Sequence, residues 1–473
     1  MSKRKLILSV LINGVLLSSL YVAGAVDVAP GSGNGVAIGT GSNAPKAENV
    51  AIGKGATIAY SGGVGQPSTG DIVIGGKAHI NNYIDQGGGI AIGANSFVEN
   101  MVGGMERAFD FNQAGYEKLF GIPFGFPKNP EKMVTGMAIG QNTYARSGSI
   151  MLGTHNYKGK LGDVDVDSSN TKNNNGHLFS TTIGANSYSN GLFSSIVGAY
   201  SIASSGYPTT TADATKNFGA TITGSLNSIE SASASSQYSG VANSIVGTAN
   251  RTFNSNGSLV FGAGNEITNS VANISAPSSG GNSAKELAET LRSAVKNSNG
   301  GGSTMAFGSG NKADYTLRSA LMGVNNTLTG SQNNESANTM LTGFHNTADK
   351  VSNTTVIGSE NTVTNSKNSL VMGDNREVKD ANHAVLIGST DSKTTTSVNN
   401  AVAVGHNTNV TVEGGVALGS ESKATVAAGS VGYDPSTKAQ STNTDSTWKA
   451  TKSAVSVGDA NNNITRQITS VAA

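Results

Sequence analysis

The chain has 473 residues, of which 62 are glycine, 13% are charged and 5% are aromatic; it has no cysteine and a formal net charge of +1. This composition cannot fill a conventional globular core, although stacked repeats can bury small residues between neighbouring coils. The low charge excludes the basic field that nucleic acid or an anionic membrane would require of a partner. The lack of cysteine excludes disulfides and thiolate metal sites.

The amino terminus predicts a secretory signal peptide over residues 1–25. A positive segment, Lys3-Arg4-Lys5, precedes an apolar run from Leu6 to Leu20, and Ala23-Gly24-Ala25 is a small-residue cleavage site. A transmembrane anchor is the alternative, which the polar interruptions of the run and its small-residue end disfavour. We therefore expect the mature chain, from about Val26, to be exported.

A short phrase recurs through residues 26–432: two or three small or β-branched residues, one aliphatic residue and then glycine. Val36-Ala37-Ile38-Gly39 is followed by Val50-Ala51-Ile52-Gly53, 14 residues later. A repeat this short cannot be a domain, so we interpret it as one coil of a stacked solenoid. We call the glycine that ends each phrase a coil glycine and expect it to be structurally required. The clearest coil glycines are Gly39, Gly53, Gly75, Gly93, Gly358, Gly373, Gly388, Gly405 and Gly419.

Each coil is predicted to contain two short strands. Side chains alternate in a strand, so Val50 and Ile52 face one way and Ala51 faces the other. The residues after the glycine, as in Gly93-Ala94-Asn95, form a turn, because Asn and Gly readily adopt positive φ. The result is a narrow, two-sided roll that leaves an apolar face in water. We expect that face to pack against other copies in a closed cyclic oligomer.

Three insertions interrupt the array, and the first, residues 98–136, is rich in aromatic side chains. The ordinary interpretation is a small local core that folds the loop onto the roll. The alternative is an aromatic contact surface for a partner. The candidate partner-binding residues are Phe109, Phe111, Tyr116, Phe120, Phe124 and Phe126.

The second insertion, residues 157–177, contains three alternating aspartates. The segment Asp163-Val164-Asp165-Val166-Asp167 is similar to the start of a calcium loop, but Ser168 replaces the required glycine. No glutamate stands at the twelfth position of such a loop, so a solvated polar loop is favoured.

The third insertion, residues 270–302, predicts a helix. Ser283 and Glu286 have the spacing of a capping box. Leu287, Leu291 and Val295 form one apolar stripe, and Gly300-Gly301-Gly302 follows. We expect this helix to lie against the roll or its symmetry mates rather than to bind a separate partner.

No motif predicts an enzyme, a cofactor or a metal site. The six histidines are scattered, and Gly75-Gly76-Lys77 lacks the spacing of a phosphate-binding loop. A calcium-dependent β-roll of the repeat-toxin kind would need aspartate in every turn. The turns here carry Asn, Ser and Gly instead.

The carboxyl-terminal segments complete a resemblance to a known family. Residues 454–473 contain Ala454-Val455-Ser456-Val457-Gly458 and then a segment that begins Arg466-Gln467-Ile468. The preceding segment, 433–453, contains Trp448. With the serial array from about Gly35 to Gly432, this pattern resembles the head and neck of YadA-like trimeric autotransporter adhesins, with 433–453 as an insert before the neck.

The resemblance implies a left-handed parallel β-roll, a homotrimer and display on the bacterial outer membrane. It implies attachment to host matrix, to a host cell-surface receptor or to other bacteria. The alternative is a passive structural spacer of a surface appendage. The stalk and membrane anchor of the family are not found in residues 1–473. We therefore expect either a fragment of a longer protein or an anchor encoded in another reading frame.

Overall fold

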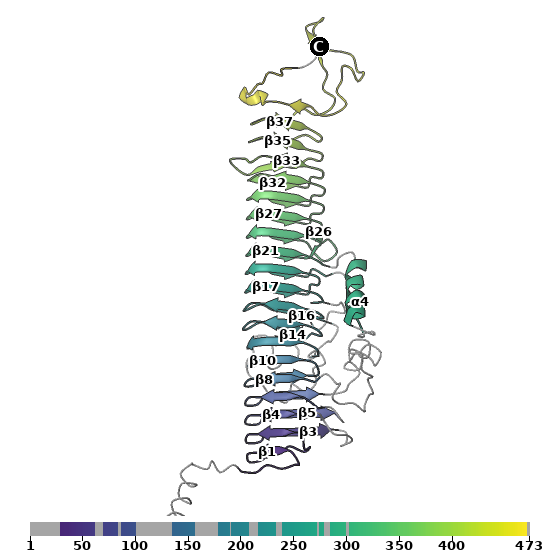
Figure 1. Cartoon of the computed structure of the whole chain (residues 1–473). Coiled ribbons are helices and arrows are strands. Elements are labelled where there is room, and N and C mark those ends of the chain that lie inside the picture. The colour runs from purple at the N-terminus through teal and green to yellow at the C-terminus, as the bar shows by residue number, and fades with distance from the viewer. Residues whose placement is uncertain are drawn as a thin grey trace, which may run out of the picture. The chain divides into compact units, whose positions relative to one another are not determined.

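A computed structural model describes residues 29–61, 70–83, 87–100, 135–156, 178–189, 191–207, 216–232, 239–271, 274–278, 284–298 and 302–470 (Figure 1). The predicted signal peptide, all six candidate aromatic residues, the insertion 157–177 and Ser283 lie outside these residues. The chain divides into unit 1, Met1–Gly103 with Phe124–Thr154, and unit 2, Gly104–Pro123 with His155–Ala473.

Unit 1 consists of two parallel sheets built from successive coils. In each coil the strand that carries the repeated phrase joins the first sheet, and the strand after the turn joins the second sheet. Phrase stacks on phrase in register, with Ala51 opposite Ala37 and Val73 opposite Ala51. The first sheet contains β1 (Val36–Ile38), β2 (Val50–Ile52), β4 (Ile72–Ile74), β6 (Ile90–Ile92), β8 (Met137–Ile139) and β10 (Ile150–Thr154). The second contains β3 (Thr57–Ser61), β5 (His79–Tyr83), β7 (Phe97–Asn100) and β9 (Tyr144–Arg146).

Unit 2 repeats this arrangement over more coils. Its first sheet contains β11 (Thr181–Ala185), β13 (Ser195–Val197), β15 (Thr221–Thr223), β17 (Ser244–Thr248), β19 (Leu259–Ala263), β21 (Met305–Ser309), β24 (Ala320–Val324), β27 (Met340–Phe344), β29 (Thr355–Ser359), β31 (Leu370–Met372), β33 (Val385–Ile387), β35 (Val402–Val404), β37 (Val416–Leu418) and β41 (Val455–Ser456). Its second sheet contains β12 (Tyr188–Ser189), β14 (Ile202–Tyr207), β16 (Ser228–Ala232), β18 (Arg251–Phe253), β20 (Glu266–Thr268), β22 (Lys312–Asp314), β25 (Thr327–Thr329), β28 (Thr347–Asp349), β30 (Thr362–Thr364), β32 (Arg376–Lys379) and β34 (Thr394–Thr396). The predicted mostly-β chain with long parallel sheets is therefore confirmed.

A few short elements complete unit 2. Two further parallel pairs are β23 (Thr316–Leu317) with β26 (Ser336–Ala337) and β36 (Asn409–Val410) with β38 (Lys423–Ala424). The second pair follows β34 in the stack, and its Val410 and Ala424 belong to the interior cluster. An antiparallel pair, β39 (Tyr433–Asp434) with β40 (Ala439–Gln440), precedes β41, and the 3-10 helix η3 (Ala460–Asn462) follows it.

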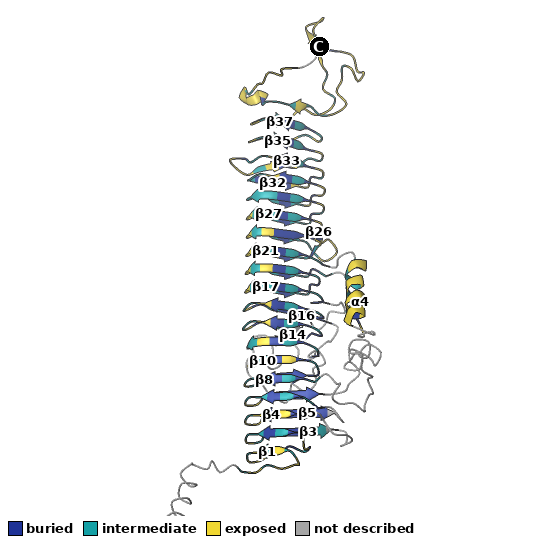
Figure 2. Cartoon of the chain, viewed as in Figure 1, coloured by how far each residue is buried: buried dark blue, intermediate teal, exposed yellow. Residues whose placement is uncertain are grey.

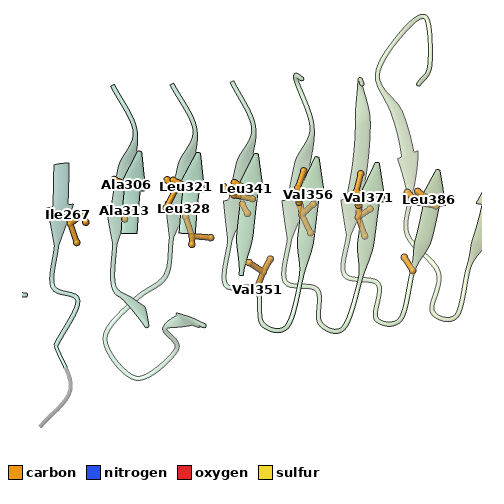
Figure 3. Packing of buried hydrophobic residues seen from close by; sticks show 14 of the residues in the cluster. Ile267, Ala306, Ala313, Leu321, Leu328, Leu341, Val351, Val356, Val371 and Leu386 are labelled. Carbon is orange, nitrogen blue, oxygen red and sulfur yellow. The ribbon is translucent and has the colours of Figure 1, made fainter. Parts of the chain in front are cut away.

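The middle residue of each phrase points into the roll, and from β2 to β37 it is buried. Ala51, Val73 and Ala91 do so in unit 1, while Val50 and Ile52 remain partly exposed, as predicted. In unit 2 the corresponding residues stack in a column with the inward residues of the second sheet (Figure 3). Because side chains alternate, this narrow interior uses every second residue of each strand and leaves the others outside.

The predicted turn geometry is also confirmed. All of the coil glycines named above have positive φ, for example 115° at Gly39 and 134° at Gly373. The second residue after the glycine is left-handed too, with φ of 56° at Asn95 and 54° at Asn407. Glycine and asparagine are the residues that adopt this conformation at least cost.

A buried ladder of asparagines runs along the turns of unit 2. Asn250, for example, donates from Nδ2 to Asn227 Oδ1 (3.0 Å) and to the carbonyl of Gly262 (2.7 Å). Each asparagine of the ladder after the first therefore donates one hydrogen bond to the asparagine of the preceding coil. It donates another to the coil-glycine carbonyl of the following coil. The rungs are Asn227, Asn250, Asn265, Asn311, Asn326, Asn346 and Asn361.

Arg376 replaces asparagine at the end of this ladder. It is the largest fully buried side chain of the described residues. Its guanidinium donates to the carbonyls of Gly388 (2.7 Å), Gly405 (3.1 Å) and Thr408 (2.5 Å), so it spans two further coils. Desolvation lowers the pKa of Arg376 to about 10, and the side chain stays charged at neutral pH.

The predicted helix is α4 (Ala284–Asn297), and it lies against the side of unit 2 (Figure 1). Leu287 is buried, and Leu291 and Val295 pack against the same apolar cluster, which also contains Phe218 and Val241. The predicted apolar stripe is therefore the packed face. The remaining positions of the helix are largely exposed (Figure 2).

Candidate functional site

The candidate site is the outward face of the first sheet, because large apolar side chains meet solvent there in many successive coils. The residues on either side of the buried middle residue point outward, as the strand period requires. Exposed fractions there reach 49% at Val36 in unit 1 and 61% at Val455 in unit 2. The exposed members are Val36, Ile38, Ile72, Ile74 and Ile150 in unit 1, and Ile183, Val197, Phe261, Met322, Met372, Ile387, Leu418 and Val455 in unit 2.

This outward face is apolar over many consecutive coils. In unit 1 the outward pair is Val and Ile in β1 and β2, and Ile and Ile in β4 and β6. The parallel register places each outward residue directly beside its equivalent in the next coil, so the side chains form continuous rows. Contiguous apolar rows of this kind are typical of an interaction surface.

In unit 2 the outward face of the second sheet is mostly polar by contrast. Thr327, Thr347 and Thr362 follow one another in register. Earlier in the sheet, Arg251 bridges two carboxylates, with Nε 3.0 Å from Glu230 and Nη1 2.8 Å from Glu266. The hydrogen bond with Glu230 raises the pKa of Arg251. This face is therefore suited to solvent, and the two faces of one roll differ in kind.

The corners between the sheets hold two exposed histidine–carboxylate pairs. His345 Nδ1 lies 2.9 Å from Glu360 Oε1, and His406 Nε2 lies 3.1 Å from Asp391 Oδ1. Hydrogen bonds lower the pKa of the Asp391 carboxyl; the one from Asn407 has the larger effect and the one from His406 the smaller. The described residues contain no group of three or more His, Cys, Asp or Glu side chains arranged to hold a metal ion.

A buried carboxylate network lies in unit 1, where sequence reasoning did not anticipate it. Asp71 is fully buried and accepts hydrogen bonds from Tyr60 Oη (2.6 Å), Asn82 Nδ2 (2.8 Å) and the Gly89 amide (3.0 Å). Desolvation raises the pKa of Asp71, although these hydrogen bonds and the nearby charge of Lys46 oppose the change.

The raised pKa of Asp71 predicts that this residue contributes more to the stability of folded unit 1 at acidic pH than at neutral pH. Folding favours the protonated form of Asp71, so its contribution to stability is complete below the pKa of the unfolded chain and is lost as pH rises through the folded pKa. We expect the melting temperature of the wild-type chain, relative to that of Asp71→Asn, to rise between pH 7 and pH 4. Circular dichroism melts of both proteins across this range measure the difference. A difference that does not change with pH would contradict the assignment.

The other predicted site residues fall into two groups. The coil glycines lie in the turns that lead from the first sheet to the second. Each approaches the backbone of the next coil, except Gly419, which approaches the side chain of Arg466. The six aromatic residues of the first insertion lie outside the described residues, so their role stays a prediction.

Comparison with protein-family models gives no match, and comparison with curated proteins gives none either. Among the residues that the structure describes, no helix has the length and apolarity needed to cross a membrane.

Proposed function

We propose that this chain is the head of a trimeric bacterial surface adhesin, built as a left-handed parallel β-roll. The supporting observation is the apolar outward face of the first sheet. In β2 and β6 the inward residue of the strand is a small one, Ala51 or Ala91. The larger Ile52 and Ile92 of the same strands lie outside. Burial of the outward rows between copies removes them from water.

The proposed assembly has three chains because the family that the sequence resembles has three. A cyclic arrangement brings equivalent coils of each copy to one axis, so every outward residue meets its own equivalent. The second sheet, with Thr327, Thr347 and Thr362 outward, then faces solvent, as its composition favours.

Receptor attachment is proposed for the insertions rather than for the repeated coils. Insertions in repeat proteins map to the outside of the array, where binding surfaces usually form. The aromatic residues of 98–136 are the first candidates, since aromatic side chains dominate many binding sites.

The function is tested by adhesion of the exported full chain to immobilised matrix proteins and to cultured cells. We expect binding by the intact chain, loss of binding on deletion of residues 99–135, and retained binding on deletion of residues 160–174. Circular dichroism of each deletion protein serves as the folding control, since stacked coils depend mainly on their neighbours. Binding by none of the proteins to any surface would favour the passive spacer.

A further inference from the structure

Four large apolar side chains are exposed at the corners of unit 2, in the two residues after a coil glycine. They are Tyr200 (54% exposed), Leu226 (58%), Val324 (43%) and Phe344 (47%). They form two pairs from neighbouring coils: the Leu226 amide donates to the Ala199 carbonyl (3.0 Å), and Val324 is the register partner of Phe344. Other corners carry polar residues, for example Glu360.

Two of these residues hold a backbone conformation that does not suit them. Tyr200 has φ of 52° and Leu226 has φ of 60°. Asparagine or glycine occupies this position in many other coils, as at Asn142 and Gly310. Left-handed backbone is costly for a bulky side chain, and such outliers persist where other contacts of the residue offset the cost. A side chain exposed to water would make no such contacts.

Each coil with an apolar corner has at least one small or polar residue on its outward face, although Val197, Met322 and Met340 keep three of these faces partly apolar. In the coils of Tyr200 and Leu226, the outward residues of the first sheet include Ser195, Thr221 and Thr223. In the coils of Val324 and Phe344 they include Ala320 and Thr342. Most other coils carry large aliphatic residues at these positions. In these four coils the corner side chain therefore adds apolar surface at the edge of the face.

We infer that these two corner pairs extend the apolar face around its edge and are buried against a neighbouring copy of this chain. The pairs continue the face directly: one glycine and one alanine separate Tyr200 from exposed Val197, and one glycine separates Val324 from exposed Met322. In a closed ring of copies, the edge of each face is where one chain meets the next. The inference rests on the proposed assembly and names the side chains that close its seams.

Labelling of introduced thiols tests the burial directly, because the chain contains no cysteine. Leu226→Cys and Glu421→Cys place a thiol at the same turn position, since Glu421 is an exposed left-handed residue with φ of 63°. In the native full chain we expect maleimide to label the thiol of Leu226→Cys at least about tenfold more slowly than that of Glu421→Cys, and both equally in urea. Equal rates in the native protein would overturn the inference.

Asparagine substitution gives a second test, because the melting temperature should change in opposite directions for exposed and for buried side chains. Asparagine relieves the strain at residues 200 and 226, so Tyr200→Asn/Leu226→Asn would raise the melting temperature if both side chains faced water. We expect it instead to fall by more than about 2 °C, while Glu421→Asn, the matched control, leaves it unchanged or higher. A higher melting temperature for the double variant, with the mass of three chains retained, would overturn this inference alone. A monomeric wild-type chain would overturn the proposed assembly as well.

Discussion

Replacement of Gly373 by valine is expected to destabilise each chain by more than about 2 kcal/mol. Gly373 has φ of 134°, and a Cβ atom there would lie 2.5 Å from the carbonyl carbon of Gly388 in the next coil. Residues held in such backbone conformations cost about 1–3 kcal/mol. Overpacking against a neighbour adds about 1–3 kcal/mol. The clash begins at Cβ, so Gly373→Ala should share most of the loss.

Gly414→Asn is the matched control for this substitution. Gly414 also has positive φ, 67°, but a Cβ atom there meets nothing within 4 Å. Asparagine tolerates this conformation, so the change in stability should be less than about 1 kcal/mol. Urea unfolding followed by circular dichroism compares the proteins. Equal midpoints for Gly373→Val and the wild type would show that the coil glycine is not required.

Replacement of Arg376 by methionine is expected to cost about 2–5 kcal/mol, since the carbonyls of Gly388 and Thr408 would lose their donor, while that of Gly405 keeps the Thr408 hydroxyl. Methionine retains much of the apolar stem but cannot donate to the carbonyls of Gly388, Gly405 and Thr408. Arg376→Asn should cost less, because an amide at this position can bind Gly388 as Asn361 binds Gly373.

Arg318→Met provides the control for Arg376→Met. Arg318 is exposed, and its Nε donates to Asn338, which is exposed too. Loss of that hydrogen bond should cost less than about 1 kcal/mol, because water replaces the donor. Urea unfolding midpoints, measured by circular dichroism, compare both variants with the wild type. A loss for Arg376→Met no larger than that for Arg318→Met would show that the buried guanidinium is dispensable.

The repeated phrase was sufficient to predict the strands and the faces of the roll. Val50-Ala51-Ile52-Gly53 specifies a strand by alternation and its end by glycine, and the structure places Ala51 inside as predicted. The helix over Ala284–Asn297 was predictable for a similar reason, since its apolar stripe is local in sequence. Its contacts were not predictable, because Phe218 and Val241 belong to earlier coils.

The buried asparagine ladder is not readily predicted from the sequence, because asparagine can occupy two positions in the turn. The second residue after the glycine takes the left-handed conformation, whereas the third points into the roll. A signal was present: Asn250, Asn265 and Asn311 all stand three residues after a coil glycine. Arg376 takes the same position after Gly373, and a single charged residue is not normally assigned to a buried row.

The central claim is that the outward face of the first sheet joins three copies of the chain. Sedimentation equilibrium of the wild type and of Ile387→Lys and Thr347→Lys, at micromolar concentration, tests it most directly. Ile387 lies on the proposed interface with 37% exposure, and Thr347 lies on the polar face between two other threonines. Lysine at 387 would bring three like charges to the axis, whereas lysine at 347 would meet solvent. We predict three chains for the wild type and Thr347→Lys, and a folded, β-rich single chain for Ile387→Lys; a stable wild-type monomer would contradict the claim.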